Sequence, residues 1–306
     1  MKKTSPTRIK TITEAHRIFG LPKPEHPLIS VFDYASLQLP STQVAEFSLL
    51  FDFYYISLKK GFSNKLYYGQ QTYDFDEGVL YFVAPNQILR GAGASADDDL
   101  SGWIICIHPD FLWGTSLANK IKKYDYFDYT VNEALFLSDK EKTILNGIVE
   151  KIKDEYHANI DKFSQDIIIS HVETLLNYSE RFYQRQFITR KITNHQLLDR
   201  FEKLLADYFS HDDLATRGLP TVQYISDNLN LSPTYLRSLL KTLTGQTTQQ
   251  HIHDKLIEKA KEKLSTTRLS VSEIAYELGF EHLPSFSKLF KAKTNQSPLE
   301  FRASFN

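Results

Sequence analysis

Two clusters of hydroxyl and cationic side chains near the C-terminus have the spacing of one helix face. In the first cluster, four such residues stand at positions i, i+3, i+4 and i+7. Arginine pairs bidentately with guanine, serine and threonine hydroxyls reach the edges of any base, and lysine binds phosphate. Lys288 fits either a base-reading or a phosphate-binding role. The candidate base-reading residues are Thr234, Arg237, Ser238, His282, Ser285, Ser287 and Lys288, and the candidate phosphate-binding residues are Lys241 and Lys291.

Other chemistry has weaker support in the sequence. His108 stands alone before a proline, and His251 and His253 form an H-x-H pair that a helix would point to different faces. The motifs H-E-x-x-H, G-x-S-x-G, Walker A and G-x-G-x-x-G are all missing from the chain. We therefore expect no metal, no cofactor and no enzymatic activity. A cupin-type metal enzyme remains the alternative, although it needs clustered histidines with a carboxylate.

The two clusters belong to an internal repeat that places them on helices. Residues 221–248 and 270–298 share one pattern, with Thr221 and Ser270 as N-caps. Asn230 and Gly279 occupy the turn, where these two residue types tolerate a positive φ. An apolar corner residue follows each turn, and an apolar i, i+4 stripe follows that. The matched pairs are Ile225/Ile274, Ser226/Ala275, Leu229/Leu278, Leu231/Phe280, Leu236/Phe286, Leu240/Phe290 and Gly245/Asn295.

This pattern predicts two helix-turn-helix units joined by a helix over residues 248–264. That helix is about 25 Å long at roughly 1.5 Å per residue. Two recognition helices held by such a spacer fit successive major grooves, which are about 34 Å apart on one face of a duplex. Any one of these helices also fits an ordinary amphipathic helix with a solvated face. Two copies with matching caps, corner residue and turn favour the DNA-binding interpretation, and a protein-interaction module without DNA binding remains a second hypothesis.

The last 110 or so residues resemble the DNA-binding domain of the AraC/XylS family of transcription regulators. The resemblance is strongest over residues 270–302, which carry the family pattern E-I-A…G-F…F-S…F-K…P…F/Y-R. It implies a sequence-specific regulator that binds double-stranded DNA. Residues that depart from the family pattern are Ser238, Thr248, His251, Lys255 and Asn295.

The first half of the chain is rich in short aromatic and β-branched runs. They cover Leu28–Asp33, Phe47–Leu58, Lys65–Gln70, Val79–Val83 and Gly102–His108, with turn residues between them. Such runs predict an antiparallel sandwich or barrel. Helical spacing follows, beginning with a capping box at Ser138 and Glu141.

The fold class is therefore α+β with two domains. We expect a β-rich sensing or dimerisation domain over residues 1–186, with its β part at about 28–108 and its helices at about 109–186. A linker is expected over 187–193 and an all-α DNA-binding domain over 194–306. Many AraC/XylS members have an N-terminal cupin-like β-barrel, so the resemblance implies one here.

Two further sites are expected in the first domain. Aromatic side chains could line a small-effector pocket, although filling the core of a small barrel is the more common role for such residues. An apolar stripe on the helix near 162–186 could pair two subunits as a homodimer, pack on its own domain, or do both. The candidate pocket residues are Tyr54, Tyr67, Tyr81 and Trp103, and the candidate dimer residues are Ile168, Val172, Leu175 and Leu176.

Composition sets the remaining expectations. The chain has 306 residues, 42% hydrophobic and 24% charged, which is an ordinary globular balance. Residues 221–306 contain 11 Lys and Arg against 8 Asp and Glu, a net charge of +3, while the whole chain has a net charge of −1. No apolar run reaches the roughly 18 residues of a membrane-spanning helix, and no secretory signal pattern is evident. We expect a cytoplasmic protein without membrane contact, with RNA polymerase as a possible partner.

Overall fold

The chain folds into two compact units, residues 1–186 and 187–306, in the computed structural model. No helix among the described residues is long and apolar enough to span a bilayer. The described residues are 6–37, 46–60, 67–68, 71–72, 78–92, 101–129, 133–158, 161–189, 191–211 and 213–304.

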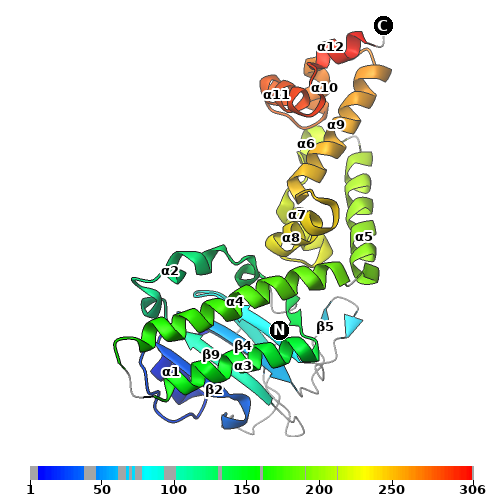
Figure 1. The fold of residues 1–306 in the computed structure, drawn as a ribbon. Coiled ribbons are helices and arrows are strands. Elements are labelled where there is room, and N and C mark those ends of the chain that lie inside the picture. The colour runs from blue at the N-terminus through cyan, green and yellow to red at the C-terminus, as the bar shows by residue number, and fades with distance from the viewer. Residues whose placement is uncertain are drawn as a thin grey trace. The chain divides into compact units, whose positions relative to one another are not determined.

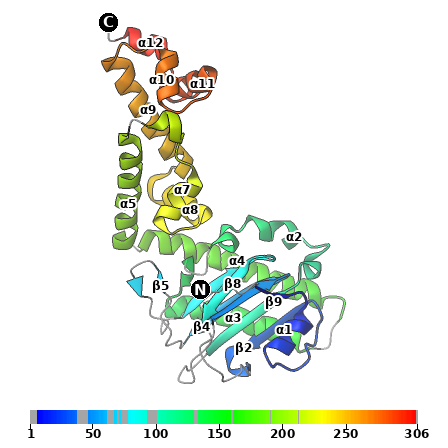
Figure 2. The same cartoon turned by 180° about the vertical axis from the view of Figure 1, so that it is seen from behind.

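The N-terminal unit is built on two main sheets, which Figures 1 and 2 show from opposite sides. The larger sheet has the strand order β10-β7-β4-β9-β2 and is antiparallel throughout, whereas the smaller has the order β1-β3-β8. Among the described residues these sheets remain separate and do not close into a barrel. The strands are β1 (Thr7–Ile9), β2 (Ile29–Asp33), β3 (Glu46–Phe51), β4 (Tyr54–Lys60), β5 (Tyr67–Tyr68), β6 (Gln71–Thr72), β7 (Val79–Val83), β8 (Ile88–Ala92), β9 (Ser101–Ile107) and β10 (Leu135–Phe136).

Side-chain alternation along the strands separates two apolar layers. Phe51 of β3, Tyr55 of β4 and Cys106 of β9 belong to the core cluster that includes both sheets. On the opposite face of the large sheet, the Trp103 indole donates a 2.9 Å hydrogen bond to Asn146 of helix α3 (Asp139–Tyr156). The large sheet is therefore covered on both faces, which explains why its strands are apolar on both sides.

The apolar run 47–58, which we expected as one strand, is two strands in different sheets. β3 ends at Phe51 and β4 begins at Tyr54, so the chain changes sheets at Asp52 and Phe53. Asp52 forms a 2.9 Å ion pair with Arg8, while Phe53 is fully buried. A continuous apolar run does not reveal such a crossing, because strands covered on both faces lose their alternation.

Helices pack on the outer face of the large sheet, where Figure 1 shows α3 and α4. The predicted capping box of Ser138 and Glu141 begins α3. The buried apolar residues of α3 are Leu145, Val149, Ile152 and Tyr156, whereas Ile144 is 38% exposed. The helices of this unit are α1 (Ile12–Ile18), α2 (Leu117–Lys120), α3 (Asp139–Tyr156) and α4 (Ser164–Thr189), with 3-10 turns at Tyr34–Ser36, Pro109–Leu112, Ile121–Lys123 and Asp125–Asp128.

The segment 187–193, expected as a linker, is largely helical. Helix α4 continues to Thr189 and α5 begins at Lys191. Phe187 is buried, and its carbonyl accepts a hydrogen bond from the Asn194 amide. The polar and basic composition of this segment concealed its helical state, because propensity is a weak signal beside tertiary packing.

The described part of the C-terminal unit is helical, as the sequence predicts. Its long helix α9 contacts α5, α8, α10, α11 and α12 and is the scaffold of the unit. Nineteen residues give α9 a length of roughly 28 Å. The helices are α5 (Lys191–Ser210), α6 (Leu214–Arg217), α7 (Val222–Leu229), α8 (Pro233–Thr244), α9 (Thr248–Thr266), α10 (Val271–Glu277), α11 (Leu283–Thr294) and α12 (Pro298–Ala303).

Candidate nucleic-acid interface

The first helix-turn-helix unit, residues 221–245, has the expected corner between α7 and α8. The Thr221 hydroxyl accepts a 3.0 Å hydrogen bond from the Tyr224 amide and caps α7. Asn230 ends that helix in the left-handed region at φ 57°. The amide of Leu231 then donates to the Ser226 carbonyl at 2.9 Å, and the Leu231 side chain is buried in the corner. Local hydrogen bonds therefore fix the angle at which α8 leaves the turn.

The second unit, residues 270–295, repeats this corner between α10 and α11. Ser270 and Glu273 form a reciprocal capping box, with hydrogen bonds of 3.2 and 2.6 Å. Gly279 occupies the turn at φ 84°. The Phe280 amide donates to the Ala275 carbonyl at 3.0 Å, which matches the Leu231 bond of the first unit. The repeat found in the sequence therefore corresponds to a pattern of backbone hydrogen bonds that occurs in both units.

The polar face of α8 lies opposite its buried face. Its inner side consists of four buried side chains, whereas Arg237 and Lys241 are exposed and Thr234 and Ser238 are half-buried. These four polar residues lie within about one third of the helix circumference, as their spacing predicts. The buried residues of α8 are Tyr235, Leu236, Leu239 and Leu240.

Helix α11 presents a more open polar face. Phe286 and Phe290 are its buried residues, and Lys288 lies on the opposite side of the helix. Both helices contact α9, and Figures 1 and 2 show α8 near one end of α9 and α11 beside its other part. The other candidate DNA-contacting residues here are exposed, except for half-buried Ser287: they are His282, Ser285, Ser287 and Lys291.

Polar contacts attach both units to α9. The Asp254 carboxylate accepts a 2.9 Å hydrogen bond from Gln246, which directly follows α8, and pairs at 2.6 Å with Lys293 of α11. Farther along α9, Lys263 pairs with Glu277 of α10 at 2.7 Å. Asp254 therefore connects the end of one recognition helix to the other, a role that sequence spacing does not reveal.

The four residues expected to line an effector pocket are not gathered in one place. Tyr81 belongs to the core cluster between the sheets, where its hydroxyl lies 3.0 Å from that of Tyr34. Tyr54 and Trp103 lie on the opposite face of the large sheet, toward Phe127 and the α3 residue Asn146. The side chain of Tyr67 is outside the described residues.

Sequence reasoning missed a buried hydroxyl network in the core. Tyr34 lies 2.6 Å from the Ser57 hydroxyl, 3.0 Å from that of Tyr81 and 3.5 Å from that of Tyr55. Burial raises the pKa of Tyr34 and the pKa of Tyr55 well above their usual value, so both phenols are neutral at physiological pH. Alternation along β4 could have indicated Tyr55 and Ser57, but Tyr34 follows β2 in a 3-10 turn.

The expected dimer stripe is packed within its own unit. Tyr126 donates a hydrogen bond to the Leu176 carbonyl, and the neighbouring apolar side chains are equally covered. Because burial inside one chain removes these atoms from a second subunit, the stripe itself favours the intramolecular alternative. Ile168, Val172, Leu175 and Leu176 are 5%, 1%, 0% and 0% exposed.

The three histidines considered above as metal ligands have structural partners. His251 lies 2.9 Å from the Thr244 hydroxyl, His253 bonds Gln249, and His108 caps the 3-10 turn that follows it. Burial lowers the pKa of His251 and the pKa of His253 below their usual value. Within the described ranges, no three His, Cys, Asp or Glu side chains converge as a metal site would require.

Comparison with known proteins agrees with this geometry. A family described as "Helix-turn-helix domain" matches residues 225–304. The HTH-type transcriptional regulator YfiF of Bacillus subtilis is 29% identical over 162 residues, covering 53% of this chain and 48% of that protein. The arabinose operon regulatory protein of Escherichia coli is 34% identical over 107 residues, covering 30% of this chain and 37% of that protein.

A solved structure is also similar to this region. The C-terminal domain of AraT, a response regulator from Geobacillus stearothermophilus, is 29% identical with a TM-score of 0.31, covering 35% of this chain and 84% of that one. The chain spans less than half the length of the two curated relatives. The C-terminal part of this chain is a helix-turn-helix domain. More particularly, it is a domain of the AraC/XylS type with two helix-turn-helix units, as its motifs predict.

Proposed function

We propose that this protein is a transcription regulator that binds specific DNA sequences by placing α8 and α11 in successive major grooves. The observation that carries the proposal is the duplicated corner, with both recognition helices packed on α9. Helix α9, roughly 28 Å long, is the rigid spacer proposed to hold α8 and α11 in successive grooves, which are about 34–36 Å apart.

The side chains on the two helices divide into two roles. Arg237 is suited to a guanine edge, and the hydroxyls of α8 and α11 are suited to several bases. Lys241 and Lys291 lie one or two helical turns along from these groups and are suited to backbone phosphates. His282 and Ser238 complete the proposed base-reading set. Lys288 is suited to contact either a base edge or a backbone phosphate.

The N-terminal unit is proposed to regulate this DNA binding. A cupin-like domain that senses a small effector and supports a homodimer agrees with its two-layered sheets and with the family resemblance. RNA polymerase is the partner proposed for transcriptional control. The name of the E. coli relative, a regulatory protein of the arabinose operon, supports operon control in general and does not identify an effector here.

Titration of the full chain against selected promoter DNA at two salt concentrations tests the proposal. A specific complex should weaken steeply with salt, with a log–log slope near −0.9 for each phosphate neutralised. Arg237→Ala should cost about 1–3 kcal/mol on the matched site and relax preference at one base pair. The control Arg268→Ala removes an exposed arginine between α9 and α10 and should change specificity little.

Two outcomes would contradict this proposal. A chain that binds no duplex DNA at low salt would be a protein-interaction module. Equal loss of affinity on matched and unrelated DNA in Arg237→Ala would make that residue a phosphate anchor and remove it from the base-reading set.

A further inference from the structure

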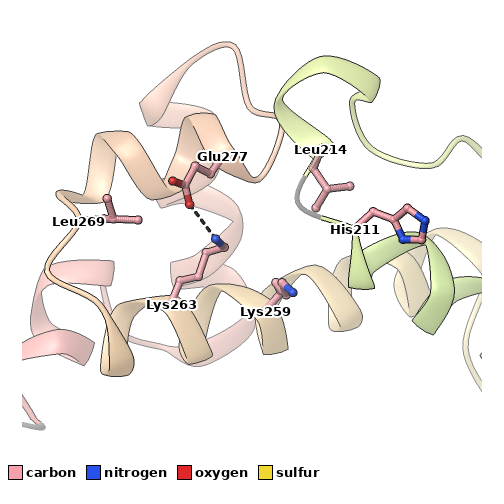
Figure 3. Close-up of a pocket in the computed structure, with 6 residues that line it drawn as sticks. All are labelled: His211, Leu214, Lys259, Lys263, Leu269 and Glu277. Carbon is pink, nitrogen blue, oxygen red and sulfur yellow. Dashed lines mark hydrogen bonds and ion pairs between the residues drawn. The ribbon is translucent and has the colours of Figure 1, made fainter.

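A pocket inside the C-terminal unit lies apart from the polar faces of α8 and α11. Its volume is about 310 Å³, and its walls come from the end of α5, from α6, from α9 and from the region around α10. Figure 3 shows the two α9 lysines along one side, with the Leu214 and His211 side chains opposite. The lining residues are His211, Leu214, Lys259, Lys263, Leu269 and Glu277.

Two lysines of α9, Lys259 and Lys263, line this pocket, and Lys255 precedes them on the same helix face outside it. Lys255, Lys259 and Lys263 are four residues apart, so they are neighbours on one helix face, where like charges repel. Lys255 is neutralised by Glu258 at 2.9 Å and Lys263 by Glu277 at 2.7 Å. Lys259, between them, has no hydrogen bond or ion pair in the part of the chain that the structure describes. Lys259 is therefore the pocket lysine that forms no ion pair among the described residues, while Glu258 and Glu262 lie with it around a neighbouring hollow.

His211 adds a second polar group to the pocket. Its Nδ1 atom lies 3.1 Å from the Ser210 hydroxyl, which leaves Nε2 as the ring nitrogen for a ligand. In Figure 3, Lys259 lies between this imidazole and the Lys263–Glu277 pair. An oxyanion at Lys259 would compete with Glu277 for Lys263, and His211 lines the same pocket from the end of α5.

The remaining walls are apolar and limit the size of a ligand. Leu214 is buried, and Leu269 lies across the pocket beside Lys263. The volume is at the lower end of the roughly 300–1,000 Å³ found for small-molecule sites. We propose that this pocket binds a small organic oxyanion, one phosphate or carboxylate group on a compact apolar body, with Lys259 as its principal contact.

This site goes beyond DNA recognition, since its ligand would bind inside the DNA-binding unit itself. Leu214 belongs to α6, before the first unit, and its carbonyl lies 2.9 Å from where a Cβ on Gly279 of the second unit would stand. A ligand in the pocket would therefore contact elements that precede one helix-turn-helix unit and elements that belong to the other.

Calorimetric titration of the full chain, without DNA and at constant ionic strength, tests the proposal. The probes are phenyl phosphate, benzoate and inorganic phosphate. We expect an organic anion to bind more tightly than inorganic phosphate, and its head group identifies the ligand class. Lys259→Gln should weaken that binding at least tenfold and His211→Gln by a smaller factor. The matched control Lys261→Gln, an exposed lysine two residues away on the same helix and outside the pocket, should leave binding unchanged.

Other results would overturn the proposal. If neither organic anion binds, the proposed site is wrong. It is also wrong if Lys259→Gln binds the anion as tightly as the parent chain does. If the anions fail to bind while Lys259→Gln lowers the salt slope of DNA binding by about one, Lys259 is a DNA phosphate contact instead. Since the titrations contain no DNA, their outcome is independent of the proposed transcriptional function.

Discussion

The two helix-turn-helix units have the same backbone corner but are held in place by different contacts. In the first unit, four buried side chains anchor α8, and the turn residue Asn230 is exposed. In the second, Phe286 and Phe290 are the buried residues of α11, and Gly279 is pressed against the backbone of α6. The first unit therefore depends on a wide apolar face, whereas the second depends on two rings and on a turn without a side chain.

This difference shows which requirements of the motif apply to both units and which apply to one unit only. A positive φ at the turn is required in both units, and Asn or Gly satisfies it. The absence of a Cβ is required in the second unit alone, because a neighbouring carbonyl occupies that space. The substitutions below separate these requirements.

Removing one ring from α11 should have the largest effect. Phe286→Ala should destabilise the chain by about 3–5 kcal/mol, since Phe286 is fully buried and packs against Phe280 and Phe290. Denaturant unfolding measures the loss, and hydrogen exchange should show α11 losing protection before α8. The matched change Leu236→Ala leaves three buried anchors on α8 and should preserve more of its local protection. Equal exchange of both helices in Phe286→Ala would contradict the asymmetry.

One substitution at each turn should separate the effect of backbone conformation from the effect of crowding. Gly279→Ala should cost about 2 kcal/mol, because it adds left-handed strain of roughly 1–2 kcal/mol and places a Cβ 2.9 Å from the Leu214 carbonyl. Asn230→Gly keeps the left-handed turn and should change stability by less than about 1 kcal/mol. Thermal unfolding of the full chain compares them. A loss of stability well below about 2 kcal/mol in Gly279→Ala would mean that α6 shifts to make room for the added Cβ.

The ion pair that connects the two units should affect DNA binding more than stability. Asp254→Asn should cost less than about 1 kcal/mol in unfolding, because both partners are partly exposed. It should weaken binding to DNA with two half-sites a few-fold and leave a single half-site unaffected. Lys293→Gln should reproduce this pattern. Equal weakening on both DNAs would show that Asp254 does not position one unit against the other.

Acid should loosen the second unit before the first. The Ser270 backbone amide bonds the Glu273 carboxylate and lowers its pKa below the usual value. The cap is therefore fully stabilising above the unfolded pKa of about 4.3 and is lost as pH falls through the lower folded pKa. The matching residue in the first unit is Tyr224, which does not titrate in acid. Glu273→Gln should remove the difference, which hydrogen exchange between about pH 6 and pH 3 would reveal; an unchanged difference would contradict this origin.

Local signals explain what the sequence could predict. Caps, turn residues and i, i+4 stripes act within one or two helical turns, so Thr221, Ser270, Asn230 and Gly279 indicated both corners correctly. The capping box at Ser138 was predicted for the same reason.

Contacts between distant segments explain what it could not predict. The sheet change at Asp52 depends on β1 and on Arg8, more than 40 residues away. The Lys259 pocket is assembled from four separate segments. No periodicity within one element reports such a contact.

Selection of bound sequences from a random DNA pool by the full chain tests the central claim most directly. The account predicts enrichment of two half-sites about 10–10.5 base pairs apart, one for α8 and one for α11. Enrichment of a single half-site, or of none, would contradict a double recognition module.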